Sequence, residues 1–299
     1  METLERRGDK SASHFSVTHV TRYVYADPVM RAHHQAWLLP RAFVGQRVLS
    51  SNLTIEPPPL RLETQEDWFG NRATWFELSA PHRQLTVTSQ AEIARDDPGP
   101  LDLAPSPPWE ETAATLAAGA APFDVQEFRF PSPLAPHLAE AEAYARQSFL
   151  PNRPLVAAMR DLTRRIHRDF TFDALATTIA TPLAEVFAER HGVCQDFAHV
   201  GIACLRAVGL AARYQSGYLE TKPPKGRPRL IGADASHAWF AGWCPGLGWI
   251  EADPTNDLMP APHVTVAWGR DFADVTPLKG VILGGGSQRL TVSVELARL

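Results

Sequence analysis

The sequence has no strong excess of either charge and no long apolar run. Its 29 Lys and Arg against 33 Asp and Glu give a net charge of −4, which offers no basic face for nucleic acid or for an anionic membrane surface. No apolar run approaches the roughly 18–20 residues of a membrane span. The polar N-terminus, METLERRGDKSASH, lacks the apolar core of a secretory signal. We therefore expect a cytoplasmic protein whose partners include neither nucleic acid nor a membrane.

Cysteine is scarce. The three cysteines, Cys194, Cys204 and Cys244, are an odd number without recognised metal-ligand spacing, which predicts free thiols in a reducing compartment. A zinc site built from Cys194, His199 and Cys204 is unfavourable, because positions five and ten apart differ by about 140° and 80° around a helix. We expect His199 and Cys204 to be packing residues and Cys244 to be an inert thiol in a hairpin loop. No metal and no cofactor are expected.

The first third of the chain has the pattern of an antiparallel β domain. Val, Thr and Tyr are frequent in HFSVTHVTRYVY, and FGN carries a turn signal. We predict a flexible tail over 1–13, a β-rich domain over 14–95 and a proline-rich linker over 96–109. One strand face of this domain is predicted from strict alternation at Leu85, Val87, Ser89, Ala91 and Ile93.

The rest of the chain reads as helices followed by strands. We predict a catalytic core over residues 110–262. A C-terminal strand segment over 263–299 is expected to pack on the preceding domains. Helices are predicted at 137–149, 154–170, 181–190 (with Thr181 as N-cap) and 194–208. Strands are predicted at 211–220, 236–243, 248–254 and 289–296, with a surface loop over 221–234.

Cys194 stands at the start of a predicted helix, in RHGVCQDFAHVGIACLRAVG. Helix N-termini carry partial positive charge and unpaired N–H groups, and both stabilise a thiolate. Gly192 would allow a tight turn and a close approach of substrate, and the N–H of Cys194 could donate to an oxyanion. The alternative is that Cys194 simply packs, as buried cysteines usually do.

His237 and Asp253 lie on two strands that the CPGLG stretch joins as a hairpin. If Trp243 pairs with Leu247, the same register places His237 opposite Asp253 on one face, within side-chain reach. Cysteine, histidine and aspartate would then act as nucleophile, base and orienting group for acyl transfer. Taken singly, His237 could equally be a half-buried histidine bonded to backbone and Asp253 a turn residue.

Three stretches resemble the motifs of the transglutaminase-like superfamily, which has a papain-like fold: GVCQDFAHV, DASHAWFAGW and GWIEADPTN. VTRYVYADPV, DWFGN and VAWGRDFADVTPLKGVILGGG resemble further segments of its bacterial subgroup. The resemblance leaves out the tail and about residues 96–150. It implies an α+β protein, in which an N-terminal antiparallel β domain packs on a core made of a cysteine-bearing helix and an antiparallel sheet.

The same resemblance implies that Cys194 is the nucleophile, His237 the general base and acid, and Asp253 the orienting group. The expected reaction is acyl transfer on a peptide or glutamine-type amide through a thioester. Water as acceptor would make the protein a peptidase or amidase, which we favour. A primary amine as acceptor would make it a transglutaminase, and a non-catalytic binding scaffold is the third possibility.

Two loops near these motifs have more than one interpretation. DWFGN, residues 67–71, could reach towards the core, but a plain hairpin turn is preferred. GRDFADV, residues 269–275, is expected to be a loop that holds the C-terminal strand. Asp196 is expected to have a structural role at the start of the helix or in a bond to a neighbouring loop.

Overall fold

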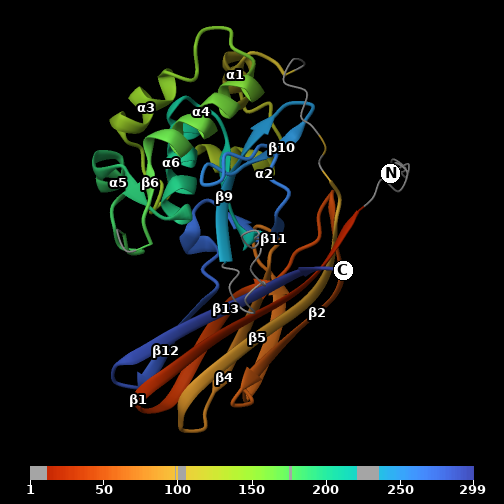
Figure 1. The fold of residues 1–299 in the computed structure, drawn as a ribbon, viewed down its shortest axis with the longest axis vertical. Coiled ribbons are helices and arrows are strands. Elements are labelled where there is room, and N and C mark those ends of the chain that lie inside the picture. The colour runs from red at the N-terminus through yellow and green to blue at the C-terminus, as the bar shows by residue number, and fades with distance from the viewer. Residues whose placement is uncertain (1–11, 98, 100–105, 175–176, 221–235) are drawn as a thin grey trace, which may run out of the picture.

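The computed structural model describes residues 12–97, 99, 106–174, 177–220 and 236–299. Most of the tail, part of the proline-rich linker and the surface loop predicted over 221–234 lie outside these residues. A large sheet occupies one end of the molecule, and a helix-rich lobe with a smaller sheet occupies the other (Figure 1). This is the expected α+β arrangement, in which an antiparallel β domain accompanies a core of helices and a second antiparallel sheet. Among the described residues, no helix combines the length and apolar character needed to cross a membrane.

The large sheet consists of a few very long antiparallel strands that are interrupted midway. β4 and β5 lie end to end along one side of β1, and β12 and β13 lie end to end along the other. β2 and β3 cover the outer edge of β5 and β4. The strands are β1 (Ser13–Leu39), β2 (Gln46–Glu56), β3 (Arg61–Glu66), β4 (Arg72–Leu78), β5 (His82–Arg95), β12 (Leu278–Gly284) and β13 (Gln288–Arg298).

The interruptions fall at one level of the sheet and coincide with prolines or glycines. Pro28 lies within β1, Pro81 separates β4 from β5, and prolines 57–59 separate β2 from β3. Proline has no N–H to donate to a ladder. The break between β12 and β13 contains glycines 284–286 instead of proline. All three adopt positive φ, a conformation that glycine adopts without steric cost. The breaks therefore let long strands bend together.

Alternation along β5 is confirmed, because Leu85, Val87, Ser89, Ala91 and Ile93 are all buried. The C-terminal strand is confirmed as well. It pairs with β1 from Phe15 opposite Arg298 to Tyr25 opposite Gln288. Its alternating side chains are buried only in the second half: Val294 and Leu296 are buried, whereas Leu290 and Val292 are exposed.

The helix-rich lobe contains the remaining elements. Its helices are α1 (Trp109–Ala117), α2 (Phe123–Gln126), α3 (Ala139–Arg146), α4 (Leu155–Asp169), α5 (Leu183–Glu189) and α6 (Cys194–Ala207), with 3-10 turns η1 (Glu127–Arg129) and η2 (Phe272–Asp274). Its small sheet has the order β10-β9-β8-β11, from β8 (Ala212–Tyr218), β9 (Ser236–Cys244), β10 (Gly248–Ala252) and β11 (Val264–Gly269). β6 (Thr171–Phe172) and β7 (His191–Gly192) form a short parallel pair.

The central helix of this lobe, α6, is surrounded by protein. Every residue from Asp196 to Arg206 is buried. Gly201 brings the helix against β9 so closely that an added Cβ would lie 2.4 Å from the ring of Phe240. The helix ends as predicted, with Gly209 at φ +85° just beyond it. For α5 the predicted cap is wrong: Pro182 occupies the N-cap position, and the hydroxyl of Thr181 accepts from the N–H of Thr178 instead.

Cys244 corrects another expectation. It is the last residue of β9 rather than part of the hairpin loop, and it is fully buried.

Two buried amide side chains of the large-sheet domain bind the free edge of the small sheet. The side chain of Gln46 accepts from the N–H of Thr265 at 2.9 Å and donates to its carbonyl at 2.6 Å. Asn71 binds Trp268 in the same bidentate way, at 2.9 and 2.8 Å. An edge strand presents unpaired N–H and C=O groups, so these amides take the place of a neighbouring strand for β11.

Residues 67–71 form the preferred hairpin turn between β3 and β4, but the turn also reaches the core, which corrects the expectation of a plain turn. The carboxylate of Asp67 accepts from the N–H groups of Phe69 and Asn71 and from the side-chain amide of Asn71. Asp67 thereby holds the side-chain amide of Asn71, which binds β11 of the core. Arg41 also donates to Asn71, at 2.6 Å.

Replacing Gln46 by alanine should destabilise the protein by about 2–4 kcal/mol, because two backbone groups of Thr265 would be left buried without partners. Chemical unfolding measures the difference. The matched control is Gln90→Ala on the exposed face of β5, which should change stability by less than about 0.5 kcal/mol. Equal effects of the two substitutions would contradict the stabilising role of the amide.

Candidate active site

Cys194 is the first residue of α6, and a buried carboxylate fixes the start of the helix. Asp196 Oδ2 accepts from the N–H of Val193 at 2.8 Å and from the hydroxyl of Thr177 at 2.6 Å. Burial raises the pKa of Asp196, although both hydrogen bonds oppose the shift. Asp196 thus ties the helix start to a neighbouring loop.

Gly192 has a packing role here. A Cβ on this residue would lie 2.7 Å from Asp196 Oδ2, so glycine makes room for the carboxylate that caps α6. The sequence had suggested a tight turn or an approach of substrate instead.

The three thiols differ in exposure. Cys194 is partly exposed, whereas Cys204 and Cys244 are fully buried. Burial raises the pKa of the Cys204 thiol strongly and that of Cys244 to about 11. The expected packing role of Cys204 agrees with its burial, and so does that of His199, whose Nε2 accepts from the N–H of Phe272. Among the three, only Cys194 is placed to meet a substrate.

His237 lies near the start of β9 and binds Asp253 with one ring nitrogen. Its Nε2 is 2.8 Å from Asp253 Oδ2. Because an ionised carboxylate only accepts, Nε2 carries the proton, and Nδ1 is left for the thiol of Cys194. Burial alone lowers the pKa of His237, but hydrogen bonds and charge interactions with Asp253 and Cys194 outweigh it and raise the pKa to about 10. The contacts with Asp253 and Cys194 therefore favour the imidazolium form of His237.

The strand register that was predicted to bring His237 and Asp253 together is wrong by two residues. Trp243 pairs with Trp249, not with Leu247. Side chains alternate with a period of two, so a shift by two leaves each residue on its face of the sheet. Asp253 follows the end of β10, where its backbone bridges Leu258, and its carboxylate still meets His237.

The Asp253 carboxylate is fully buried and receives donors from several segments. Oδ1 accepts from the N–H groups of Thr255 at 2.9 Å and Asn256 at 3.3 Å. Oδ2 accepts from Asn256 Nδ2 at 2.7 Å and from His237 and His263, each at 2.8 Å. Burial raises the pKa of Asp253, but the histidine hydrogen bonds and charges prevail and hold it well below its usual range.

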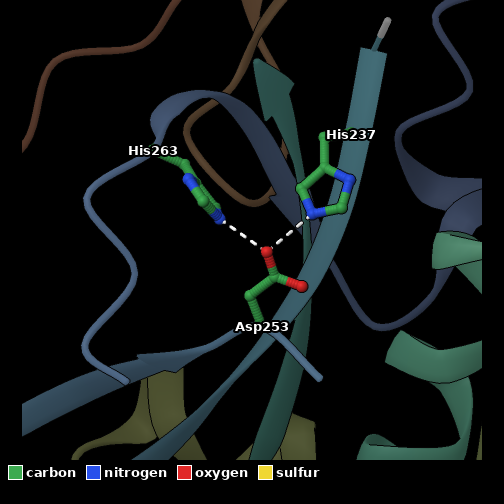
Figure 2. Close-up of side chains that lie close together, drawn as sticks. All are labelled: His237, Asp253 and His263. Atoms are coloured by element: carbon green, nitrogen blue, oxygen red, sulfur yellow. Dashed lines mark hydrogen bonds and ion pairs between the residues drawn. The ribbon is translucent and has the colours of Figure 1, made fainter. Parts of the chain in front are cut away.

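His263 is the residue that sequence reasoning missed. Figure 2 shows the rings of His237 and His263 converging on the same carboxylate oxygen. His263 directly precedes β11 and lies beyond the three quoted motifs. Its partner is ten positions away across a loop, so no helical or strand spacing signals the pair. Asn256 lies within GWIEADPTN, but the sequence gives no sign that its side chain donates to Asp253.

His237, Asp253 and His263 also deserve consideration as metal ligands. Among the described residues they are the one group whose possible ligand atoms lie close enough together, within 4.8 Å, to hold an ion. Ligand atoms around a tetrahedral Zn²⁺ with bonds of about 2.0–2.1 Å would be roughly 3.3 Å apart. The carboxylate oxygen is 2.8 Å from both nitrogens, a distance that fits hydrogen bonds better.

A cavity of about 370 Å³ lies beside the first turns of α6. Gln195, Asp196 and His199 form one wall, and the other walls are mainly apolar, from segments 133–138 and 179–184.

Two family models match this chain. Residues 15–94 match the bacterial transglutaminase-like N-terminal region, and residues 142–254 match the transglutaminase-like superfamily. An uncharacterized protein of Mycobacterium tuberculosis (strain ATCC 25618 / H37Rv) is 44% identical over 293 residues, covering 94% of this chain and 92% of the relative. A protein-glutamine gamma-glutamyltransferase of Pseudomonas aeruginosa is 31% identical over 118 residues, covering 38% of this chain and 17% of that protein.

One solved structure supports the fold over nearly the whole chain. The crystal structure of a candidate cysteine protease from Cytophaga hutchinsonii superposes with a TM-score of 0.75 at 22% identity, covering 97% of this chain and 92% of that one. At this identity the likeness bears on architecture: the large sheet and the helix-rich lobe occur together in both proteins.

Replacing Asp253 by asparagine should lower the pKa of His237 from about 10 by about 1–3 units, because the nearby negative charge is lost while burial persists. NMR titration of isotope-labelled histidines measures the change. Asp257→Asn is the matched control, because Asp257 lies in the same loop and pairs with Arg160. A pKa of His237 that is equal in both variants would contradict the assigned role of the carboxylate.

Proposed function

Because the chain belongs to the transglutaminase-like superfamily, we propose that it is a cysteine-dependent acyl-transfer enzyme acting on peptide or glutamine-type amides. The observation that carries the proposal is the chain of contacts from Cys194 to His237 to Asp253. It combines a partly exposed thiol at a helix N-terminus with a protonated imidazole whose other nitrogen is held by a buried carboxylate. This is the nucleophile, base and orienting group that acyl transfer requires.

Each step follows from these groups. The Cys194 thiolate attacks the carbonyl carbon, a C–S bond forms, and the carbonyl electron pair moves onto oxygen. The main-chain N–H of Cys194 is a donor for that oxyanion. As the C–N bond breaks, His237 gives its Nδ1 proton to the leaving amine or ammonia, and a thioester remains.

The thioester is resolved by the neutral His237. Its Nδ1 takes a proton from the acceptor, whose oxygen or nitrogen attacks the thioester carbon, and Cys194 leaves as thiolate. Water as acceptor gives hydrolysis, and a primary amine gives transfer. We favour hydrolysis, because water is the general acceptor and its exclusion needs special architecture.

Amine transfer is the second candidate function. It is supported by the 31% identity to the gamma-glutamyltransferase, which extends over 118 residues. The substrate in either case is a peptide or protein, and the cytoplasmic location stays a prediction. A non-catalytic scaffold would not need the buried carboxylate to keep His237 charged.

Cys194 should be alkylated rapidly at pH 6, well below the pKa of about 8.5 of a free thiol, because the imidazolium of His237 stabilises the thiolate. Peptide mass spectrometry reads the rate at each cysteine, with buried Cys204 and Cys244 as internal controls. His237→Ala should slow the reaction at least tenfold at this pH, whereas His137→Ala, at an exposed position, should not. A Cys194 as inert as the other two thiols would favour the scaffold.

Incubation with a glutamine-containing peptide should release ammonia, and Cys194→Ser should abolish the release. Adding a primary amine separates the two candidate functions. Hydrolysis leaves a deamidated or cleaved peptide whether or not amine is present. Incorporation of the amine in place of water would overturn the preference for hydrolysis and establish transfer.

A further inference from the structure

His263 shares an acceptor atom with His237 but belongs to a different segment. Its Nε2 lies 2.8 Å from Asp253 Oδ2, the same oxygen that His237 Nε2 binds at 2.8 Å. The residue is 1% exposed, so water does not compete for this bond. In Figure 2 the two imidazoles approach the carboxylate from different sides. A displacement of either ring would therefore move Oδ2 and change the hydrogen bond of the other ring.

The ring of His263 is also packed directly against the ring of His237. The two centroids are 5.3 Å apart and the planes are inclined at 85°. His263 also meets the indole of Trp239 edge-on, at 4.9 Å and 77°. Such contacts prefer defined geometries, so His263 restricts the ring of His237 by packing as well as through Asp253.

The main chain of His263 is held by the large sheet. Arg95, near the end of β5, donates Nε to the carbonyl of His263 at 3.0 Å. Arg95 is itself fixed by Glu251 of β10 through a buried ion pair of 2.7 Å. Gln46 binds Thr265 two positions further on. His263 is therefore braced from the domain that carries none of the three proposed catalytic side chains.

The charge state of His263 suits a supporting role. Burial is the main reason that its pKa lies below the usual value, although Asp253 opposes the shift. Its Nδ1 is buried and has no hydrogen-bond partner among the described residues. A neutral imidazole stabilises a carboxylate by donation without cancelling its charge. A lysine or arginine here would cancel the charge that His237 needs.

We propose that His263 is a positioning residue: it holds the Asp253 carboxylate and the ring of His237 in the arrangement that keeps His237 against Cys194. The proposal rests on the proposed function of that site. His263 contacts neither the thiol nor the reacting atoms, and it acts through Asp253 and through ring packing.

Two substitutions separate donation from packing. His263→Phe keeps an aromatic ring but removes the donor, and His263→Gln keeps a donor that can reach Oδ2. We expect Cys194 alkylation at pH 6 to fall on the order of tenfold in His263→Phe, the scale of one hydrogen bond to a charged group, and to be largely restored in His263→Gln. His34→Phe is the control, because His34 is a buried histidine stacked on Phe76 in the large sheet.

A second readout does not depend on the thiol. In wild-type protein, the two imidazole N–H protons bonded to Asp253 should give exchange-protected low-field proton NMR signals. His263→Phe should remove one signal, shift the other and change the pKa of His237. If the Phe variant does not fold, His263→Asn, whose shorter amide does not reach Oδ2, replaces it.

The two readouts distinguish the two hypotheses. An unchanged His237 signal, pKa and alkylation profile in folded His263→Phe would overturn the positioning role and leave the proposed function intact. An inert Cys194 in wild-type protein would overturn the proposed function, while the shift of the His237 signal would still decide whether His263 positions that ring.

Discussion

The arrangement of the candidate site depends on one buried charge, the carboxylate of Asp253. Removing an ion from water costs several kcal/mol unless hydrogen bonds compensate. Compensation comes from the backbone and side chain of the following turn, from His237 on β9 and from His263 before β11. The turn donors are local, but the two histidines come from segments that are separate in the sequence, so the full set of donors exists only once the small sheet is assembled. Completion of the site therefore depends on the packing of the core.

The large sheet takes part in this assembly. Its amide side chains bind the open edge of β11, and Arg95 binds the carbonyl of His263. A stack of alternating arginines and tryptophans adds to the interface: the guanidinium of Arg41 lies 3.2 Å from the ring centre of Trp268, and that of Arg213 lies 3.6 Å from the same ring and 4.4 Å from Trp249. Burial lowers the pKa of Arg41 to about 10 and holds that of Arg213 well below its usual value. The contact between the buried Arg41 and Trp268 joins the two lobes.

The sequence predicts most features that depend on local pattern, although the cap of α5 is an exception. The face of β5, the start of α6 at Cys194 and the glycine after its end all follow from periodicity and capping, and the structure has them. The hairpin register was wrong, yet His237 still meets Asp253, because an even shift preserves the face. His263 was missed, and the reach of residues 67–71 to the core was considered but not preferred, because both depend on contacts between distant segments. No periodicity connects Asn71 to Trp268, 197 positions away.

The two histidines on Asp253 cannot both be charged. Two imidazoliums beside one carboxylate would leave a net positive charge in a buried place, which is costly unless a further anion is present. Among the described residues, His237 contacts the Cys194 thiol, which supplies a further anion in the thiolate form that the proposed mechanism uses. The proton therefore belongs on His237, whose pKa is raised, while the pKa of His263 is lowered chiefly by its burial. Distance from the thiol thus assigns opposite states to two similar rings, and it is this difference that makes one a candidate for proton transfer and the other a support.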